Sequence, residues 1–298
     1  MALIRNLQDW PARPGSYPAT ENPRHVLLGH PGGFRIDAVH NPLMADAAGL
    51  PKAIDQERAL AQWTALRDAF QESGLVCLAL EPHPNLPDLC FTANPSFVVP
   101  TTADRREIWL AHMRFPARAP ESELHAGFFH AAGYLLKTMP TEVVRFEGHG
   151  DGLWHPGRFL LHAAVGTRTE LRAWEILQDA YPELDILLYE LADGDCYHLD
   201  TALATLSETC ALIVPSAFSE EGLEMLRAAF PDAIELTPAQ GSALLGNAFC
   251  ADGKTVFLPA GDPSLAARIE AKGFQVVVLD LSEFHKAGGS VFCLKQAY

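Results

Sequence analysis

The sequence predicts an α/β fold in which one unit repeats and the repeats close into a ring. First, a polar corner, a β run, a turn and a second β run recur at a spacing of roughly 40 to 60 residues, usually followed by a helical pattern. Second, the last unit lacks its second strand; residues 25–29 could supply it, which would leave no exposed edge. Third, 298 residues with 48% hydrophobic content can bury a sizeable core. An open α/β sheet with a few hairpins is the alternative.

The elements begin after an irregular leader. Residues 1–24 are rich in proline, asparagine, arginine and glycine, which favour turns and loops. The first strand is expected at His25–Gly29. Apolar residues then recur at helical spacing over Gln56–Ser73 and are followed by a strand-like run, Leu75–Leu80. Since no linker marks a boundary further on, residues 25–298 are predicted to form a single domain.

The later units share the same pattern of paired β runs followed by a helix. The pairs are Asn94–Val99 with Glu107–His112, Asp151–His155 with Phe159–Ala164, Asp200–Thr205 with Cys210–Val214, and Asn247–Cys250 with Thr255–Leu258. The helices are expected at 120–134, 168–180, 219–229 and 263–272. A last β run is expected at Ser290–Leu294, and this is the run that needs a partner from the N-terminal end.

Charge and composition exclude several classes of protein. Lysine and arginine total 22 against 37 aspartates and glutamates, a formal charge of −15, so there is no extended basic surface for nucleic acid or an anionic membrane. A cationic small molecule is a better candidate ligand for a protein with this negative charge. We expect no signal peptide, because polar and proline-rich sequence follows the first residues, and no stretch is apolar enough to predict a membrane span. Six scattered cysteines indicate reduced thiols in the cytoplasm.

Four segments place polar functional residues beside glycines or turn residues at the starts of the β units. They are Phe91–Pro95, Phe146–Asp151, Tyr197–Thr201 and Lys286–Cys293. In a ring of repeats, every unit delivers its corner to the same end of the central axis. Side chains from these four segments are therefore expected to converge.

The residue types in these corners suit nucleophilic catalysis on a guanidinium group. A thiol is a nucleophile only as its thiolate, which Cys293 can become beside a protonated histidine or a cationic substrate. His198 with Glu147 could supply a base held by a carboxylate. A guanidinium presents five N–H donors in one plane, so its site needs acceptors such as Asp200 and Asn94.

Each of these residues, taken singly, also has a structural interpretation. Cys293 could be a buried cysteine in a C-terminal strand, since most free cysteines are inert. His198 could be a satisfied histidine between strands, and Asp200 could accept backbone hydrogen bonds in a turn. Glu147 is harder to explain as a solvated charge because it lies in a tight glycine corner.

Other kinds of site find little support. His149, His155 and His162 are close in sequence, but closely paired cysteine or histidine ligands are missing, so no metal is expected. The chain has no glycine-rich phosphate loop after a strand and no G-x-S-x-G elbow. No cofactor is therefore predicted.

Together the four segments resemble the guanidino-group-modifying (pentein) superfamily, which includes arginine deiminases, dimethylargininases, amidinotransferases and arginine dihydrolases. The resemblance rests on H-L-D-T at His198–Thr201, E-G-x-G-D at Glu147–Asp151 and G-G-x-x-x-C at Gly288–Cys293. These motifs stand in the family's order, and the likeness covers most of the chain. It implies a five-bladed α/β propeller, with a pseudo-fivefold repeat and a ring closed by the N- and C-terminal strands.

The resemblance also implies a role for each motif residue. Cys293 would attack the guanidinium carbon and form a covalent S-alkylthiouronium intermediate. His198 would protonate the leaving ammonia and then activate water, with Glu147 orienting it. Asp200 would bind the guanidinium nitrogens.

Three further residues are expected to bind substrate. Arg118 and Arg168 resemble the arginines that hold the substrate carboxylate, for which a planar fork of donors is suited. Asp151 is also expected to bind substrate. His149 occupies a position where relatives often have glutamate or alanine, and this substitution could alter the choice of substrate.

One corner departs from the arginine deiminase pattern. Phe91–Asn94 reads F-T-A-N where deiminases typically have F-T-R-D, so an amide replaces a carboxylate. Asparagine can donate as well as accept, which suits a neutral ureido group. The segment L-P-D-x-x-F-T-A-N, Leu86–Asn94, looks most like the ornithine-forming arginine dihydrolases. The prediction is thus conversion of L-arginine to L-ornithine, carbon dioxide and two ammonia.

Several alternatives stay open. A deiminase or dimethylargininase would stop at citrulline after one hydrolytic cycle. An amidinotransferase would use an amine in place of water. A ribosome-binding propeller would share the fold without its catalytic residues, and the sequence leaves open whether the chain forms a homo-oligomer.

Overall fold

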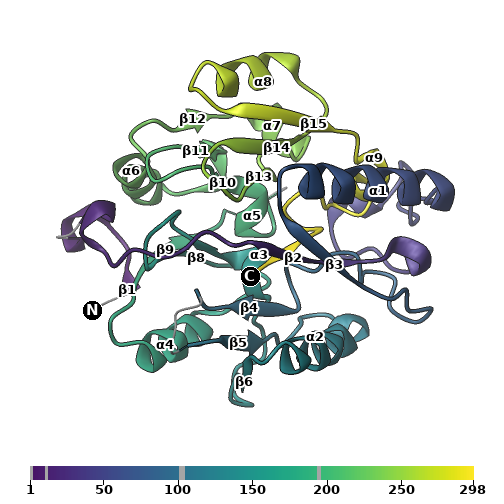
Figure 1. The fold of residues 1–298 in the computed structure, drawn as a ribbon, viewed down its shortest axis with the longest axis horizontal. Coiled ribbons are helices and arrows are strands. Elements are labelled where there is room, and N and C mark those ends of the chain that lie inside the picture. The colour runs from purple at the N-terminus through teal and green to yellow at the C-terminus, as the bar shows by residue number, and fades with distance from the viewer. Residues whose placement is uncertain (1–2, 11–12, 101–104, 193–195) are drawn as a thin grey trace.

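The computed structural model describes residues 3–10, 13–100, 105–192 and 196–298. Within these residues the strands form five separate sheets (Figure 1). In Figure 1 the sheets lie around the centre of the molecule, where the C-terminus is found. The sequence thus predicted the α/β class, whereas a closed five-bladed ring stays a prediction.

Each sheet repeats one topology, a hairpin followed by a parallel strand that is reached through a helix. In one unit β4 (Ser96–Val98) pairs antiparallel with β5 (Glu107–Leu110), and β5 pairs parallel with β6 (Leu135–Thr138). The helix α2 (Ala119–Ala131) makes the crossover. The predicted repeat is therefore present in the structure.

Three more units follow the same order. Their strands are β7 (Gly152–Trp154), β8 (Leu160–Val165) and β9 (Asp185–Glu190); β10 (Leu203–Thr205), β11 (Ala211–Ile213) and β12 (Ile234–Glu235); and β13 (Phe249–Cys250), β14 (Thr255–Pro259) and β15 (Gln275–Leu279). Their crossover helices are α4 (Leu171–Ala180), α6 (Glu220–Ala229) and α8 (Pro263–Glu270). These helices lie close to their predicted positions.

The fifth unit joins the two ends of the chain. The C-terminal strand β16 (Gln296–Ala297) pairs antiparallel with β2 (His25–Gly29), and β2 pairs parallel with β3 (Val76–Leu80) after the helix α1 (Gln56–Glu72). The expectation that residues 25–29 complete the last unit is confirmed.

The β run predicted at Ser290–Leu294 is wrong, because these residues form turns and the strand begins at Gln296. The backbone N–H groups of Phe292 and Cys293 bind the side-chain oxygen of Asn247 at 3.0 and 3.2 Å. A backbone N–H that donates to a side chain is not free to donate to a neighbouring strand. The apolar composition of the run reflects burial in a turn.

The leader contains regular structure that the sequence did not predict. Leu3–Ile4 form a short strand, β1, which pairs parallel with β9 and extends that sheet to four strands. Two short 3₁₀ turns follow at Leu7–Asp9 and Pro14–Ser16. A strand of two residues shows no periodicity. Residues 1–2 and 11–12 of the leader lie outside the described residues.

The long helices pack one apolar face against the sheets. In α1 the buried residues Trp63, Leu66 and Phe70 recur at intervals of three and four, which places them on one face. Asp55 begins the helix by accepting a hydrogen bond from the backbone of Arg58 at 3.0 Å. No helix in the described part of the chain is long and apolar enough to cross a membrane.

Short helical turns fill the corners between the larger elements. They are α3 (Gly148–Asp151), α5 (Leu199–Ala202), α7 (Pro238–Ser242) and α9 (Ser282–His285), with 3₁₀ turns at Pro31–Gly33, Pro42–Met44, Pro116–Arg118 and Pro215–Ala217. The turns α3 and α5 come directly before β7 and β10 and lie near the centre of the molecule in Figure 1. They carry two of the predicted catalytic motifs.

Candidate active site

Glu147 is placed by a glycine turn. It directly precedes α3, where Gly148 has a φ of +47°, a conformation that favours glycine. A Cβ at Gly148 would also overlap the carbonyl of Ser96. The glycine therefore lets the turn pack against the neighbouring unit and brings the Glu147 carboxylate toward α5.

Glu147 and His198 form a buried pair. His198 Nε2 lies 2.8 Å from Glu147 Oε2, and Arg168 donates to the same oxygen at 3.0 Å. Burial alone would raise the pKa of Glu147, but the charge of Arg168 and the hydrogen bond with His198 outweigh it and hold that pKa below its ordinary value. The carboxylate is thus ionised and fixes the imidazole through Nε2, which leaves Nδ1 for other contacts.

The thiol of Cys293 lies against Asp200. Sγ donates to Asp200 Oδ2 over 3.1 Å, and both residues are buried. Burial raises the pKa of Cys293 well above its ordinary value, and the nearby Asp200 carboxylate raises it further. Burial also raises the pKa of Asp200 to about 7. The second oxygen, Oδ1, has no hydrogen-bond partner among the described residues.

Asn247 holds the turn that carries the thiol, and it was not among the predicted site residues. Its Nδ2 donates to Cys293 Sγ at 3.2 Å and to the backbone oxygen of Asp200 at 2.8 Å. Its Oδ1 accepts from the backbone of Cys293. The position of Asn247 at the corner of the fourth predicted unit was the available signal.

Asn94 and Arg118 contact each other. Arg118 Nη1 donates to Asn94 Oδ1 at 3.2 Å, while its Nε and Nη2 are bound by Glu121 at 2.8 to 3.2 Å. Most of the hydrogen-bonding capacity of the Arg118 guanidinium is therefore already used. Asn94 Nδ2 is buried and has no partner among the described residues, so the amide presents an unused donor.

Arg168 is held among aromatic rings. Its guanidinium lies 4.7 Å from the ring centre of Phe115 and 4.9 Å from that of Tyr197. The Tyr197 hydroxyl donates to the backbone oxygen of Gly288 at 2.7 Å, which ties this ring to the turn before the thiol. Arg168 is thus fixed between the ring of Phe115 and the segment that carries Tyr197 and His198.

Five predicted residues line one small cavity. They are Cys293, His198, Asn94, Arg118 and Arg168. Its volume is about 20 Å³, room for about one water molecule. The other residues of the lining are His40, Asn41, Met44, Asp88, Phe91, Tyr197, Ala287 and Gly289. A cavity of this volume is too small for an amino-acid substrate, so it must open for the substrate to bind.

Glu147, Asp200 and Asp151 do not line this cavity, although the first two contact residues that do. Asp151 Oδ1 accepts from the backbone N–H of Leu199 at 3.1 Å. In this geometry Asp151 holds the start of α5, behind the side chains that face the cavity. Burial raises its pKa to about 6.

The histidines close in sequence are placed away from the cavity. His149 donates to the backbone oxygen of Gly152 at 2.8 Å and accepts from the N–H of Val98 at 3.1 Å. His155 and His162 contact each other at 3.0 Å. Within the described part of the chain, no cluster of three histidine, cysteine or acidic residues is arranged to hold a metal ion.

Comparisons with known proteins identify relatives over nearly the whole chain, although no family model matches it. An N(G),N(G)-dimethylarginine dimethylaminohydrolase of Mycobacterium tuberculosis is 38% identical over 284 residues, covering 95% of this chain and 88% of the relative. A bifunctional arginine dihydrolase/ornithine cyclodeaminase of Nostoc is 30% identical over 271 residues, which is 90% of this chain but 37% of the relative.

A solved structure supports the same relationship. The N-terminal domain of a cyanobacterial arginine dihydrolase, as a cysteine-to-serine variant bound to substrate, superimposes with a TM-score of 0.84. It is 26% identical, and the match covers 92% of this chain and 97% of that domain. The chain belongs to the family of guanidino hydrolases that contains dimethylarginine dimethylaminohydrolases and arginine dihydrolases, and it acts on guanidino carbon–nitrogen bonds.

Proposed function

We propose that this protein is a cysteine-dependent arginine dihydrolase, which converts L-arginine and two water molecules to L-ornithine, carbon dioxide and two ammonia. We further propose that residues 25–298 form a five-bladed propeller with the active site on its axis. One observation carries the choice of reaction. Asp200 Oδ1 is a buried acceptor and Asn94 Nδ2 a buried donor, and neither atom has a hydrogen-bond partner among the residues that the structure describes.

This pair of atoms matches a ureido group. A guanidinium has N–H donors and no acceptor, so it binds Asp200 Oδ1 but leaves Asn94 Nδ2 unsatisfied. The ureido group of citrulline has both N–H donors and a carbonyl oxygen, so it can satisfy both atoms. Because leaving a buried donor unpaired costs about 1–3 kcal/mol, the site favours keeping citrulline for a second reaction.

The first cycle removes one ammonia. Cys293 Sγ bonds to the guanidinium carbon, and the carbon–nitrogen bond breaks as His198 gives a proton to the leaving ammonia. Water then attacks the thiouronium carbon while His198 takes its proton, and the carbon–sulfur bond breaks to release citrulline. Glu147, bound to His198 Nε2, keeps the imidazole oriented through both steps.

The second cycle repeats the attack on the ureido carbon. Loss of the second ammonia leaves a thiocarbamate on Cys293, and hydrolysis of that bond gives the carbamate of ornithine. The carbamate then loses carbon dioxide. Arg168 and Arg118 lie beside the same cavity and are the groups proposed to bind the substrate carboxylate.

A dimethylargininase is the second candidate. It is favoured by the 38% identity to the dimethylarginine dimethylaminohydrolase of Mycobacterium tuberculosis. This reaction would release dimethylamine and stop at citrulline, which requires only the first cycle.

Product analysis tests the choice. The protein is incubated with arginine that carries ¹³C at the guanidino carbon, and the label is followed by NMR alongside amino-acid analysis. The expected result is bicarbonate, with one ornithine and two ammonia for each arginine consumed. Accumulation of labelled citrulline without ornithine would refute the dihydrolase. Dimethylamine released from dimethylarginine, with arginine left intact, would favour the second candidate.

The cysteine mechanism needs its own control. Cys293→Ser should lose all turnover on both substrates while its circular dichroism and thermal midpoint stay close to those of the wild type. The buried Cys90→Ser serves as the matched variant, because this cysteine does not line the cavity. Turnover retained in Cys293→Ser would remove the covalent mechanism while leaving the family assignment intact.

A further inference from the structure

A second and larger cavity lies behind the catalytic residues. Its volume is about 300 Å³, and it shares no lining residue with the cavity at Cys293 within the described part of the chain. Residues from one short segment nevertheless line both cavities: Phe292 and Lys295 line the second, and Cys293 lines the first. We refer to this larger cavity as the second pocket.

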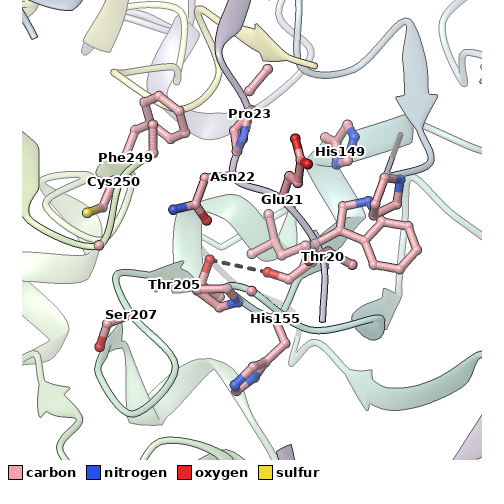
Figure 2. A pocket seen from close by; sticks show the side chains of 18 of the residues that line it. Thr20, Glu21, Asn22, Pro23, His149, His155, Thr205, Ser207, Phe249 and Cys250 are labelled. Atoms are coloured by element: carbon pink, nitrogen blue, oxygen red, sulfur yellow. Dashed lines mark hydrogen bonds between the residues drawn. The ribbon is translucent and has the colours of Figure 1, made fainter. Parts of the chain in front are cut away.

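The walls of the second pocket include several aromatic rings and come from distant parts of the chain. Trp154, Phe249, Phe292 and Tyr298 line it, and the segment Thr20–Pro23 crosses it. Figure 2 shows Phe249 and Cys250 on one side and His149 on the other, with Asn22 and Glu21 between them. A concave site with aromatic walls and a few polar groups is typical of a small-molecule site.

Lys295 brings into this pocket an amino group that has no hydrogen-bond partner among the described residues. The residue is only 3% exposed, and its Nζ lies 3.1 Å from the ring centre of Phe292 and 4.6 Å from that of Phe249. No acceptor among the described residues hydrogen-bonds this ammonium. Burial lowers the pKa of Lys295 to about 7, although the charges of Asp200 and Cys293 act in the opposite direction. A buried ammonium without an acceptor is costly unless an anion joins it.

The histidines and carboxylates of the pocket already have partners or face solvent. His149 is bound on both ring nitrogens by backbone groups. His155 contacts the backbone oxygen of Glu208 at 3.0 Å, and the Glu208 carboxylate binds Arg158 at 2.9 Å. Glu21 is exposed, so water screens its charge. Lys295 is therefore the group that a ligand would satisfy.

We propose that the second pocket binds a small carboxylate with an apolar or aromatic body. Its carboxylate pairs with Lys295 Nζ, and its body packs against Trp154 and Phe249. The aliphatic stem of the lysine and the rings exclude water from this ion pair, which strengthens it. The site is distinct from the substrate cavity and does not depend on which guanidino compound is hydrolysed there.

A matched pair of probes tests this proposal. 4-(Trifluoromethyl)benzoate carries the anion, and 4-(trifluoromethyl)benzamide has nearly the same shape without the charge; ¹⁹F NMR reports the binding of each. The benzoate should bind the wild type at millimolar concentrations or below. Lys295→Met keeps the apolar stem and should weaken the benzoate about tenfold or more, with little effect on the benzamide. The exposed Lys254→Met should change neither.

Two further variants separate the competing outcomes. Arg168→Met removes a cation from the substrate cavity; benzoate binding that falls with this variant and not with Lys295→Met would overturn the proposal. Thr205→Phe narrows the second pocket and leaves Lys295 intact, so it should reduce binding even if Lys295→Met fails to fold. If Lys295 served only to balance the charge of Asp200, the benzoate would bind wild type and Lys295→Met equally. That result, or no binding to the wild type, would refute the site.

Discussion

At the scale of single residues, the chemistry of Cys293 is set by Asp200. The two side chains share a hydrogen bond of 3.1 Å in a buried place, and burial makes each of them less acidic. The resting nucleophile is therefore a thiol. A cation that arrives at Asp200 Oδ1 would lower the pKa of both groups, because an opposite charge favours their ionised forms. The substrate itself thus helps to form the thiolate.

This activation predicts a preference between two alkylating agents of similar shape. 2-Chloroacetamidine is a cation and 2-chloroacetamide is neutral, so the amidine should alkylate Cys293 at least about tenfold faster relative to free cysteine. The rates are measured by mass spectrometry of the intact protein. Asp200→Asn should remove most of the preference. Equal relative rates in the wild type would show that substrate charge plays no part in activation.

Asn94 offers the most direct test of the second cycle. Asn94→Asp keeps the shape of the side chain but replaces the donor Nδ2 with an oxygen, which would face the carbonyl oxygen of a ureido group. Arginine should still be converted to citrulline, while hydrolysis of citrulline falls about tenfold to a hundredfold. The ratio of citrulline to ornithine, measured over time, is the readout. Ornithine as the sole amino-acid product of Asn94→Asp would contradict the proposed role.

At this scale the sequence was informative about residues inside motifs and silent about residues outside them. Cys293 and His198 each stand in a short motif, and both line the cavity as expected. Asn247 lies 46 residues from Cys293, so only the fold reveals their contact. Asp151 belongs to a motif, but its carboxylate turns toward the backbone of Leu199 instead of the cavity.

At the scale of elements, the turn α3 shows why the glycines of the E-G-x-G-D motif are needed. Gly150 packs so closely on the opposite corner that a Cβ there would lie 2.6 Å from Asn94 Nδ2 and 3.0 Å from His198 Cδ2. No methyl group fits at these distances. The small residue lets two functional side chains approach the same point.

Gly150→Ala should therefore damage catalysis more than folding. The added methyl group must displace His198 or Asn94, and a shift of about 1 Å can lower turnover by about a hundredfold. Turnover and the thermal midpoint are measured together. Gly127→Ala is the control: it lies in α2 with open space around its Cβ, so it should retain activity and gain about 0.5–1 kcal/mol of stability. Wild-type turnover in Gly150→Ala would contradict the close packing.

The elements themselves could be predicted where they are long and periodic. Helix α1 begins at Gln56, as its spacing of apolar residues predicts. The strand expected at Ser290–Leu294 was misplaced because apolar residues in a buried turn look like those of a short strand. Asn247 binds the backbone of that turn but is distant from it in sequence. No signal in the sequence therefore indicated that this contact would override the β propensity of the segment.

At the scale of the whole molecule, the joining of the two ends fixes the position of the nucleophile. Asn247 binds the thiol of Cys293. Shortly after Cys293 the chain enters the strand β16, which pairs with β2. The missing strand in the last repeat predicted this closure. The pairing of β1 with β9 was not predictable, since its two residues carry no periodic signal.

The buried carboxyl of Asp200 should make the stability of the whole protein depend on pH. Its pKa rises from 3.8 to about 7 on folding, and burial is the main cause. A carboxyl group whose pKa is raised in the native state binds more protons there than in the unfolded state. The contribution of Asp200 to the free energy of unfolding therefore falls as the pH rises from about 4 to about 7 and then levels off.

Asp200→Asn removes this penalty and should stabilise the protein while abolishing turnover. At about 1.4 kcal/mol per pH unit between pH 5 and the pKa of about 7, the gain in the free energy of unfolding should be about 2.5 kcal/mol larger at pH 8 than at pH 5. Urea denaturation at the two pH values measures it, and the exposed Asp37→Asn should show no such difference. A gain that is equal at both pH values would mean that Asp200 ionises freely in the folded protein. A pH-dependent gain in an inactive variant would show that the guanidinium-binding carboxylate is maintained at a cost in stability.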